Sequence, residues 1–231
     1  MSASISISIP AYNEQETIEP LIRESLLVLA KRTDDYEVVV INDGSTDRTR
    51  TIVDALSREN PRVKVFHHER NMGFGATLKD VFQKPTKEIV FFIPGDAQIA
   101  PGEMDKLLPA LDSADLILGW RRDRQDAGFR KLLSGTYNLL ISLFLRARVH
   151  DVDTVVVFKR SLINAIHFSA DSAFVHAELL LETHRKGFRW IEQVISHRER
   201  QSGSSTIFKL KVILPVFRDI FRYIVRRLFF Q

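Results

Sequence analysis

The side chains best suited to chemistry lie in residues 91–98, FFIPGDAQ, where an apolar stretch ends in Asp96 and Gln98. A carboxylate at the end of a buried strand is costly unless it is paired or bound to a cation. Carboxylate and amide oxygens suit Mg²⁺ or Mn²⁺ rather than zinc. An ion held by Asp96 and Gln98 would neutralise a diphosphate and stabilise it as a leaving group. The alternative is that Asp96 only caps the following turn.

Three other segments with polar or glycine residues follow apolar stretches, namely residues 10–14, 42–45 and 119–122. In an open α/β sheet, ligands bind at the carboxyl ends of the strands, so these segments and Asp96 are expected to form one site. A functional loop is expected at residues 121–128.

Polar side chains in the first two segments are candidates for binding a nucleoside. Tyr12 can stack on a base or pack at the mouth of the site, and Asn13, Glu14 and Asp43 can hydrogen-bond a base or a ribose. The alternative is that Asn13 and Glu14 only start a helix, and that Asp43 only builds a turn.

Alternating strand-like and helix-like stretches position these segments. Short apolar stretches predict strands at residues 4–10, 36–41, 63–67, 89–93, 116–118 and 154–159. Helical spacing of apolar residues predicts helices at residues 14–31 and 129–145. This alternation predicts an α/β fold, with a mostly parallel sheet flanked by helices on both faces.

The composition is that of a folded protein with one large domain, since 45% of the 231 residues are hydrophobic and 27% are charged. The absence of cysteine excludes disulfides and thiolate metal sites. The N-terminus does not read as a secretory signal, and no apolar stretch reaches the roughly 20 residues that span a bilayer. The net charge of +4 is compatible with an acidic or phosphorylated partner.

Residues 207–231 combine bulky apolar side chains with cations at near-helical spacing, and Asp219 is their one acid. The cations are Lys209, Lys211, Arg218, Arg222, Arg226 and Arg227. This pattern predicts a basic amphipathic segment at a membrane interface, following a domain formed by residues 1–206. Pro215 is expected to kink or divide the helix. The alternative is a last helix packed on the domain.

Three motifs in order resemble glycosyltransferase family 2: residues 10–14 (PAYNE), 40–47 (VINDGSTD) and 71–76 (NMGFGA). Within that family, the chain is most similar to polyprenol-phosphate sugar synthases such as dolichol-phosphate mannosyltransferase. The resemblance covers residues 4–206 and implies the Rossmann-like GT-A fold. It also implies metal-dependent, inverting transfer of a sugar from a UDP- or GDP-sugar to a polyprenyl phosphate.

The resemblance further implies a donor site and an acceptor site. The donor nucleotide-sugar would contact Pro10, Tyr12, Asn13, Glu14, Asp43, Gly73, Asp96 and Gln98. Asp96 and Gln98 would hold Mg²⁺ or Mn²⁺. The acceptor phosphate would contact Arg121, Arg130, Arg200 and Ser205. Asp96 and the three arginines are the predicted catalytic residues. No nucleic-acid partner is expected, and the expected location is peripheral, on the cytoplasmic face of a membrane.

Two segments depart from the family pattern. The metal motif is usually Asp-x-Asp-x-Gln, and Pro94 replaces its first acid. Residues 151–159 lack the Gly-Phe pair that often follows an acid such as Asp151. These departures motivate a non-catalytic nucleotide- and membrane-binding protein as one alternative. Another is a glycosyltransferase acting on a saccharide hydroxyl, whose carboxylate base would be Asp126, Asp151 or Asp153.

Overall fold

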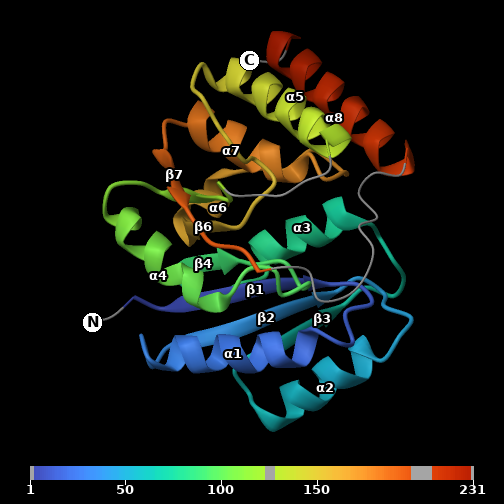
Figure 1. Ribbon diagram of the computed structural model, residues 1–231, viewed down its shortest axis with the longest axis vertical. Helices are drawn as coiled ribbons and strands as arrows, with labels where there is room; N and C mark the ends of the chain where they lie inside the picture. Colours follow the sequence, from blue (N-terminus) through green and yellow to red (C-terminus); the bar gives the residue numbers. More distant parts are fainter. Residues whose placement is uncertain (1–2, 123–127, 199–209, 230–231) are drawn as a thin grey trace.

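The computed structural model of the chain describes residues 3–122, 128–198 and 210–229. A seven-stranded sheet, in the order β3-β2-β1-β4-β6-β5-β7, lies at its centre (Figure 1). The strands are β1 (Ile5–Ala11), β2 (Tyr36–Asn42), β3 (Val63–His67), β4 (Ile89–Phe92), β5 (Leu116–Trp120), β6 (Val156–Lys159) and β7 (Trp190–Val194). The six strands expected from the sequence are therefore confirmed, whereas β7 was not predicted.

The helices are α1 (Ile18–Ala30), α2 (Thr49–Glu59), α3 (Phe74–Gln83), α4 (Met104–Leu107), α5 (Gly128–Leu145), α6 (Arg160–Ala165), α7 (Val175–Arg185) and α8 (Leu210–Phe229). Two short 3-10 helices, Pro101–Glu103 and Leu108–Asp112, flank α4. The predicted helices at residues 14–31 and 129–145 correspond to α1 and α5.

Strand direction divides the sheet into two parts. β1 pairs in parallel with β2 and β4, and β2 pairs in parallel with β3. β6 runs antiparallel to both β4 and β5, while β7 pairs in parallel with β5. The carboxyl ends of β1, β2 and β4 therefore lie at one edge of the sheet, as the mostly parallel arrangement predicted.

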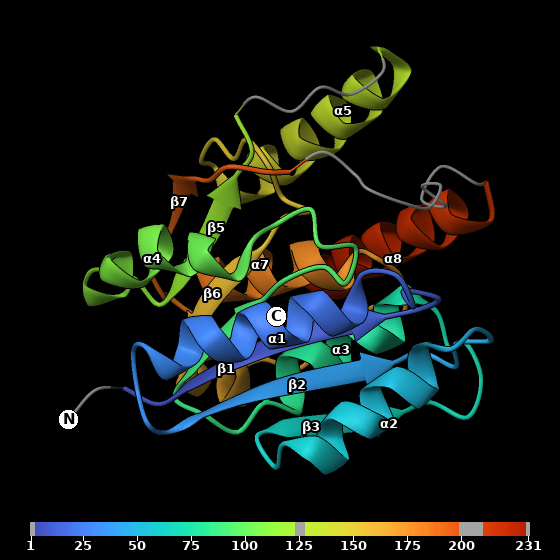
Figure 2. The same ribbon diagram turned by 60° about the horizontal axis from the view of Figure 1, so that its bottom comes forward.

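Two apolar cores cover the two faces of the sheet. One face packs against α1, α2 and α4. The other face packs against α3, α6 and α7, and α5 and α8 complete this second core (Figure 2). β1 and β2 are buried along their whole lengths, as expected of parallel strands that helices cover on both sides.

The C-terminal helix α8 contains Pro215 and packs on the domain through Ile220 and Tyr223. The Tyr223 hydroxyl donates a hydrogen bond to Glu182 of α7 (3.0 Å). The buried carboxylate of Asp219 accepts hydrogen bonds from the backbone NH groups of Asp171 (2.8 Å) and Ser172 (2.9 Å). The predicted boundary at residue 206 lies outside the described residues. Within the described part of the chain, no helix combines the length and apolarity that crossing a membrane requires.

Candidate active site

Two of the predicted segments touch where β1 and β4 end. Gly95 approaches the carbonyl of Pro10 so closely that a Cβ atom on Gly95 would lie 2.4 Å from that oxygen. The Thr17 hydroxyl donates a hydrogen bond to the Gly95 carbonyl (2.9 Å), which ties the start of α1 to the same turn. Only glycine fits at position 95, so this contact brings Asp96 beside residues 10–14.

A second set of hydrogen bonds joins residues 10–14 to the segment after β2. Asn13 has a left-handed backbone (φ 58°), and its side-chain oxygen accepts a hydrogen bond from the Thr46 NH (2.8 Å). The Asn13 NH donates to the Ser45 hydroxyl (3.0 Å), and the Glu14 NH donates to the Thr49 hydroxyl (2.8 Å). Glu14 also starts α1, as its alternative role expected, since its carbonyl accepts hydrogen bonds from the NH groups of Thr17 (3.1 Å) and Ile18 (2.9 Å). Binding of a ribose or base by Asn13 or Glu14 remains a prediction.

Asp43 follows β2 and organises the loop that precedes α3. Its buried carboxylate accepts hydrogen bonds from the NH groups of Met72 (2.8 Å) and Gly73 (3.1 Å) and from the His68 ring (2.7 Å). A carboxylate has about four acceptor positions, and these three hydrogen bonds occupy most of them. Asp43 therefore builds a turn, which was its alternative role, and contact with a nucleotide remains a prediction.

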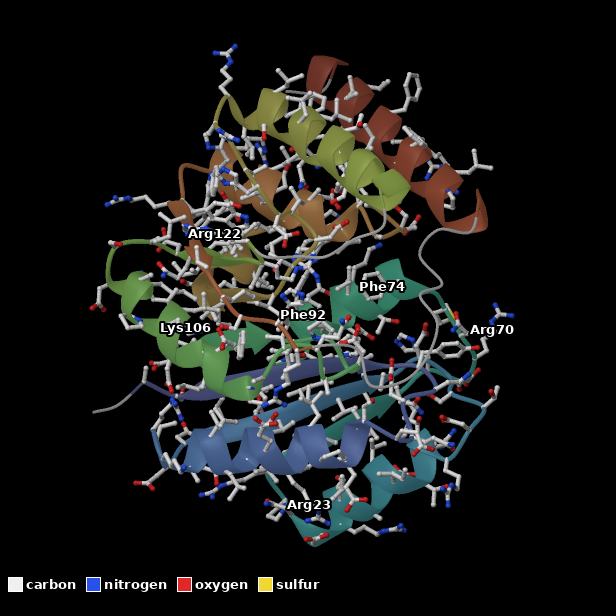
Figure 3. All side chains as sticks on the ribbon, in the orientation of Figure 1. Arg23, Arg70, Phe74, Phe92, Lys106 and Arg122 are labelled. Atoms are coloured by element: carbon white, nitrogen blue, oxygen red, sulfur yellow. The ribbon has the colours of Figure 1, made fainter. Side chains whose placement is uncertain are left out.

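Exposed apolar side chains surround this turn. Tyr12, Met72 and Phe74 are all about half exposed, and Figure 3 labels Phe74 at the start of α3. Large exposed apolar groups beside polar ones are typical of a binding site. The sequence prediction included Tyr12 but missed Met72 and Phe74. Their signal was available in residues 71–76, whose glycine turn presents its neighbours to solvent.

Asp96 is half-buried and caps the turn that follows it, which was its alternative role. Its Oδ1 atom accepts a hydrogen bond from the Gln98 NH (3.1 Å), across a turn in which Ala97 has φ 57°. Within the described residues, no group of three His, Cys, Asp or Glu side chains could hold a metal ion. Mg²⁺ retains waters and binds phosphate oxygens, so one carboxylate and one amide oxygen fit it. The residues present are thus compatible with a metal shared between the protein and a diphosphate.

Arg121 follows β5 and is bonded to Asp151. Its Nε and Nη2 atoms donate to the two carboxylate oxygens of Asp151 (2.7 and 2.9 Å), and Nη2 also donates to the Asp153 carbonyl (2.7 Å). The Asp151 side chain is buried and that of Arg121 nearly so. This bidentate pair fixes the loop before β6. Asp151 was considered as a base for a hydroxyl acceptor, but its oxygens already accept hydrogen bonds from arginine.

A second cluster at the end of β5 was not anticipated. The Trp120 ring stacks on the His150 ring at a centroid distance of 4.2 Å, and the Arg122 guanidinium lies 4.8 Å from the Trp120 ring centroid. His150 Nδ1 is bonded to Glu192 of β7 (2.7 Å). No sequence spacing signals these contacts, because β7 itself was missed.

Two polar residues of α7 are structural. His176 is buried edge-on against Phe82 and Phe92. Burial, with a smaller effect of the nearby Arg121 charge, lowers the pKa of His176 to about 3, so its ring is neutral at ordinary pH. The buried Glu178 carboxylate accepts hydrogen bonds from the backbone NH groups of Ser169 (3.0 Å) and Ala170 (2.9 Å).

Four of the predicted side chains lie outside the described part of the chain. Arg200, Ser205 and Asp126 lie outside the described residues. Arg130 belongs to α5, and its side chain lies outside the described part of the chain. Their roles stay predictions.

A mostly parallel sheet with carboxylates at the ends of β2 and β4 matches the GT-A fold. Residues 6–170 match the sequence profile of glycosyl transferase family 2, and the chain belongs to this family. The predicted family and fold class are therefore confirmed.

Curated relatives are similar over most of the chain. An undecaprenyl-phosphate 4-deoxy-4-formamido-L-arabinose transferase from Edwardsiella ictaluri is 30% identical over 213 residues, which is 90% of this chain and 64% of that protein. A protein of the same name from Pectobacterium carotovorum subsp. carotovorum is 28% identical, over 91% of this chain and 64% of that protein. The chain thus spans less than two thirds of the length of these relatives.

Solved structures show the same fold at lower identity. Glucosyl-3-phosphoglycerate synthase from Mycobacterium tuberculosis, in complex with Mn²⁺, UDP and phosphoglyceric acid, has a TM-score of 0.74 at 21% identity. The match covers 97% of this chain and 78% of that chain. The same enzyme in complex with Mg²⁺ and UDP has a TM-score of 0.67 at 21% identity, over 97% of this chain and 79% of that chain.

Proposed function

We propose that this chain transfers a sugar from a nucleotide-diphospho-sugar, with UDP or GDP as the nucleotide, to a polyprenyl phosphate. The observation that carries this proposal is that Asp43 and Asp96 lie at the same end of the sheet. Gly95 brings Asp96 beside residues 10–14, and Asp43 bonds to the loop after β3. The undecaprenyl-phosphate transferases among its relatives support the acceptor class. UDP in the related solved structures favours UDP over GDP.

The donor would lie across the carboxyl ends of β1, β2 and β4. Asp43 would hydrogen-bond the base, and the half-exposed Tyr12 can stack on it. Pro10, Asn13, Glu14 and Gly73 form the surrounding turns. Asp96 and Gln98 would hold Mg²⁺ or Mn²⁺, which when bound neutralises charge on the diphosphate leaving group.

The acceptor phosphate is an anion near neutral pH, so transfer does not require a carboxylate to remove a proton. One phosphate oxygen would form a bond to the anomeric carbon as the bond from that carbon to the diphosphate oxygen breaks. The nucleoside diphosphate would leave, with inversion at the anomeric carbon. Arg121, Arg130, Arg200 and Ser205 are the proposed contacts of the acceptor phosphate, and the arginines would stabilise the developing charge.

The acceptor class implies work at a membrane, and exposed apolar side chains on two helices suit that contact. On α8, Phe217 and Phe221 are 57% and 67% exposed, beside the exposed cations Arg218 and Arg222. On α5, Leu143 is 68% exposed. Both helices lie on the side of the sheet opposite α1 and α2 (Figures 1 and 2).

Apolar side chains next to arginines suit an interface with anionic headgroups. We therefore propose peripheral binding of the chain to the cytoplasmic side of a membrane, with residues 207–231 as the main contact and α5 as a second one.

A donor screen tests the proposed reaction. The protein would be incubated with Mg²⁺ or Mn²⁺, a short polyprenyl phosphate and a panel of UDP- and GDP-sugars, including a UDP-activated 4-deoxy-4-formamido-L-arabinose. We expect nucleotide release from one donor only when the lipid phosphate is present. Lipid-independent release with transfer to a saccharide would instead support the hydroxyl acceptor. Nucleotide binding without turnover on any donor would contradict the proposed reaction.

A further inference from the structure

Two consecutive histidines at the end of β3 each bridge two side chains. The His67 ring bonds through Nδ1 to the Asn42 amide nitrogen (2.9 Å) and through Nε2 to Asp54 (2.9 Å). The His68 ring bonds through Nδ1 to Asp43 (2.7 Å) and through Nε2 to Asp80 (3.0 Å). The two rings therefore differ in one partner, because His67 has an amide where His68 has a second carboxylate.

That difference sets which hydrogen bonds each ring has to make. The Ser45 NH donates to the Asn42 side-chain oxygen (3.2 Å), which turns the Asn42 amide nitrogen toward His67. The Asn42 amide can donate and the Asp54 carboxylate accepts, so the His67 ring has one donor and one acceptor as partners. An ionised carboxylate only accepts, so His68 satisfies Asp43 and Asp80 together only as an imidazolium.

The His68 ring also holds the loop that carries the donor site. Asp43 binds the ring and the backbone NH groups of Met72 and Gly73, while Asp80 anchors the other side of the ring on α3. The turn at Gly44 packs directly on this loop, since a Cβ atom there would lie 2.3 Å from the Arg70 carbonyl carbon. A change in the ring's charge would therefore act on the position of Asp43.

We propose that His68 is a positioning residue that, in its protonated form, holds Asp43 and the loop before α3 in the geometry that binds the donor nucleotide. Loss of the proton would leave a ring nitrogen lone pair facing a carboxylate and loosen that geometry. Nucleotide affinity would consequently fall as pH rises. This inference rests on the donor site proposed above.

The charges around the His68 ring also favour its protonated form. Burial acts to lower the pKa of His68, but the hydrogen bonds and charges of Asp43 and Asp80 outweigh it, so the pKa of His68 lies above its ordinary value. Among the described residues, these two carboxylates are the charged groups that bond to the ring. The two hydrogen bonds from His68 to Asp43 and Asp80 are therefore both formed below the ordinary imidazole pKa of about 6.5. One of them is lost as pH rises through the raised pKa of folded His68.

Calorimetry with UDP and GDP in the presence of Mg²⁺, at about pH 6 and about pH 8.5, tests this role. Wild-type affinity should fall roughly tenfold at the higher pH, the equivalent of one charge-assisted hydrogen bond. Asp80→Asn should remove most of this pH dependence, because the amide that replaces the carboxylate can donate to neutral His68 as Asn42 does to His67. His68→Gln should bind weakly at both pH values. The titration of the nucleotide phosphate is common to all variants and cancels in the comparison.

Asp54→Asn is the matched control, because it makes the same change beside His67, and it should keep the wild-type pH dependence. Equal pH dependence in wild type and Asp80→Asn would overturn the inference while leaving the donor site intact. An NMR titration in which His68 loses its proton below the ordinary imidazole pKa would also overturn it. Absence of UDP and GDP binding to the wild type at about pH 6 would instead refute the donor site itself.

Discussion

Around the ends of β1, β2 and β4, side-chain oxygens bond to the backbone of neighbouring loops, whereas α5 and α8 present apolar side chains to solvent. Asp43 bonds to two backbone NH groups, and Asn13 bonds to the segment after β2. In contrast, Leu143, Phe217 and Phe221 are all more than half exposed. The first region is organised by contacts within the chain. The second exposes apolar side chains, which is typical of a surface that contacts a partner, and the proposed partner is a membrane.

The largest effect should come from Asp96→Asn, which tests whether the first region carries the chemistry. Turnover should fall about 10³-fold, because a lost charge interaction at a developing leaving group costs about 3–4 kcal/mol. The free energy of unfolding should change by less than about 1 kcal/mol, since Asp96 is only half-buried. Steady-state kinetics and urea denaturation would measure the two quantities. Asp112→Asn, at an exposed carboxylate, is the control. Near-normal turnover of Asp96→Asn would exclude its proposed role.

Asp151→Asn should separate stability from donor binding. It leaves the Arg121 guanidinium beside an amide, and breaking a largely buried ion pair costs about 3 kcal/mol of unfolding free energy. Affinity for UDP should stay within about twofold, because in the described part of the chain Asp151 bonds to Arg121 and not to the residues proposed to contact the donor. Urea denaturation and calorimetry would measure both effects. Restored stability in Arg121→Gln/Asp151→Asn would confirm the coupling, and a larger loss of UDP affinity than of stability would contradict this assignment.

His176 should make the folded protein sensitive to acid. Because the pKa of His176 is lowered to about 3 in the fold, the unfolded chain binds this proton first, and stability is lost as pH falls below about 6.5. At about pH 4.5 the loss from this residue should approach 2–3 kcal/mol. Urea denaturation of wild type and His176→Leu at about pH 7 and pH 4.5 would measure it. Equal losses in the two proteins would show that the ring is not buried as neutral.

Phe217→Glu and Phe221→Glu test the partner of the second region. Each should weaken binding to anionic vesicles about tenfold, since partial burial of a phenylalanine contributes about 1.5 kcal/mol. Leu143→Glu on α5 should have a similar or smaller effect. Leu27→Glu is the matched control, because Leu27 is 66% exposed on α1, on the opposite side of the sheet. Vesicle co-sedimentation would measure binding. Unchanged binding, together with loss of a dimer in ultracentrifugation, would identify a second copy of the chain as the partner.

The smallest effect is expected at Arg198, whose side chain pairs with Glu24 at the surface. Exposed ion pairs contribute at most about 1 kcal/mol, so Arg198→Ala should change the unfolding free energy by less than that. Its backbone NH, which donates to the Gln98 carbonyl (2.7 Å), is unaffected by the substitution. Turnover should therefore stay within about twofold of wild type. A larger loss of turnover would mean that the Arg198 side chain acts in the active site.

Much of the fold could be predicted from the sequence because local patterns specify it. The continuous apolar stretch of β2 and the helical spacing of α1 depend on neighbours in the chain, and both were predicted. β7, WIEQV, was missed because it is short and only half-buried, and its apolar residues do not form a continuous stretch. The antiparallel direction of β6 could not be predicted either, because pairing with β4 and β5 over long sequence separations sets it.

The order of residues by itself determined the class of fold and the family motifs, since these depend on residue type and local spacing. Only the tertiary structure decided which side chains meet. Arg121 lies 30 residues from Asp151, and His68 lies 25 and 12 residues from the carboxylates of Asp43 and Asp80. Whether a carboxylate binds a ligand, an arginine or a histidine depends on contacts that the packing of distant segments creates, and no local pattern encodes those contacts.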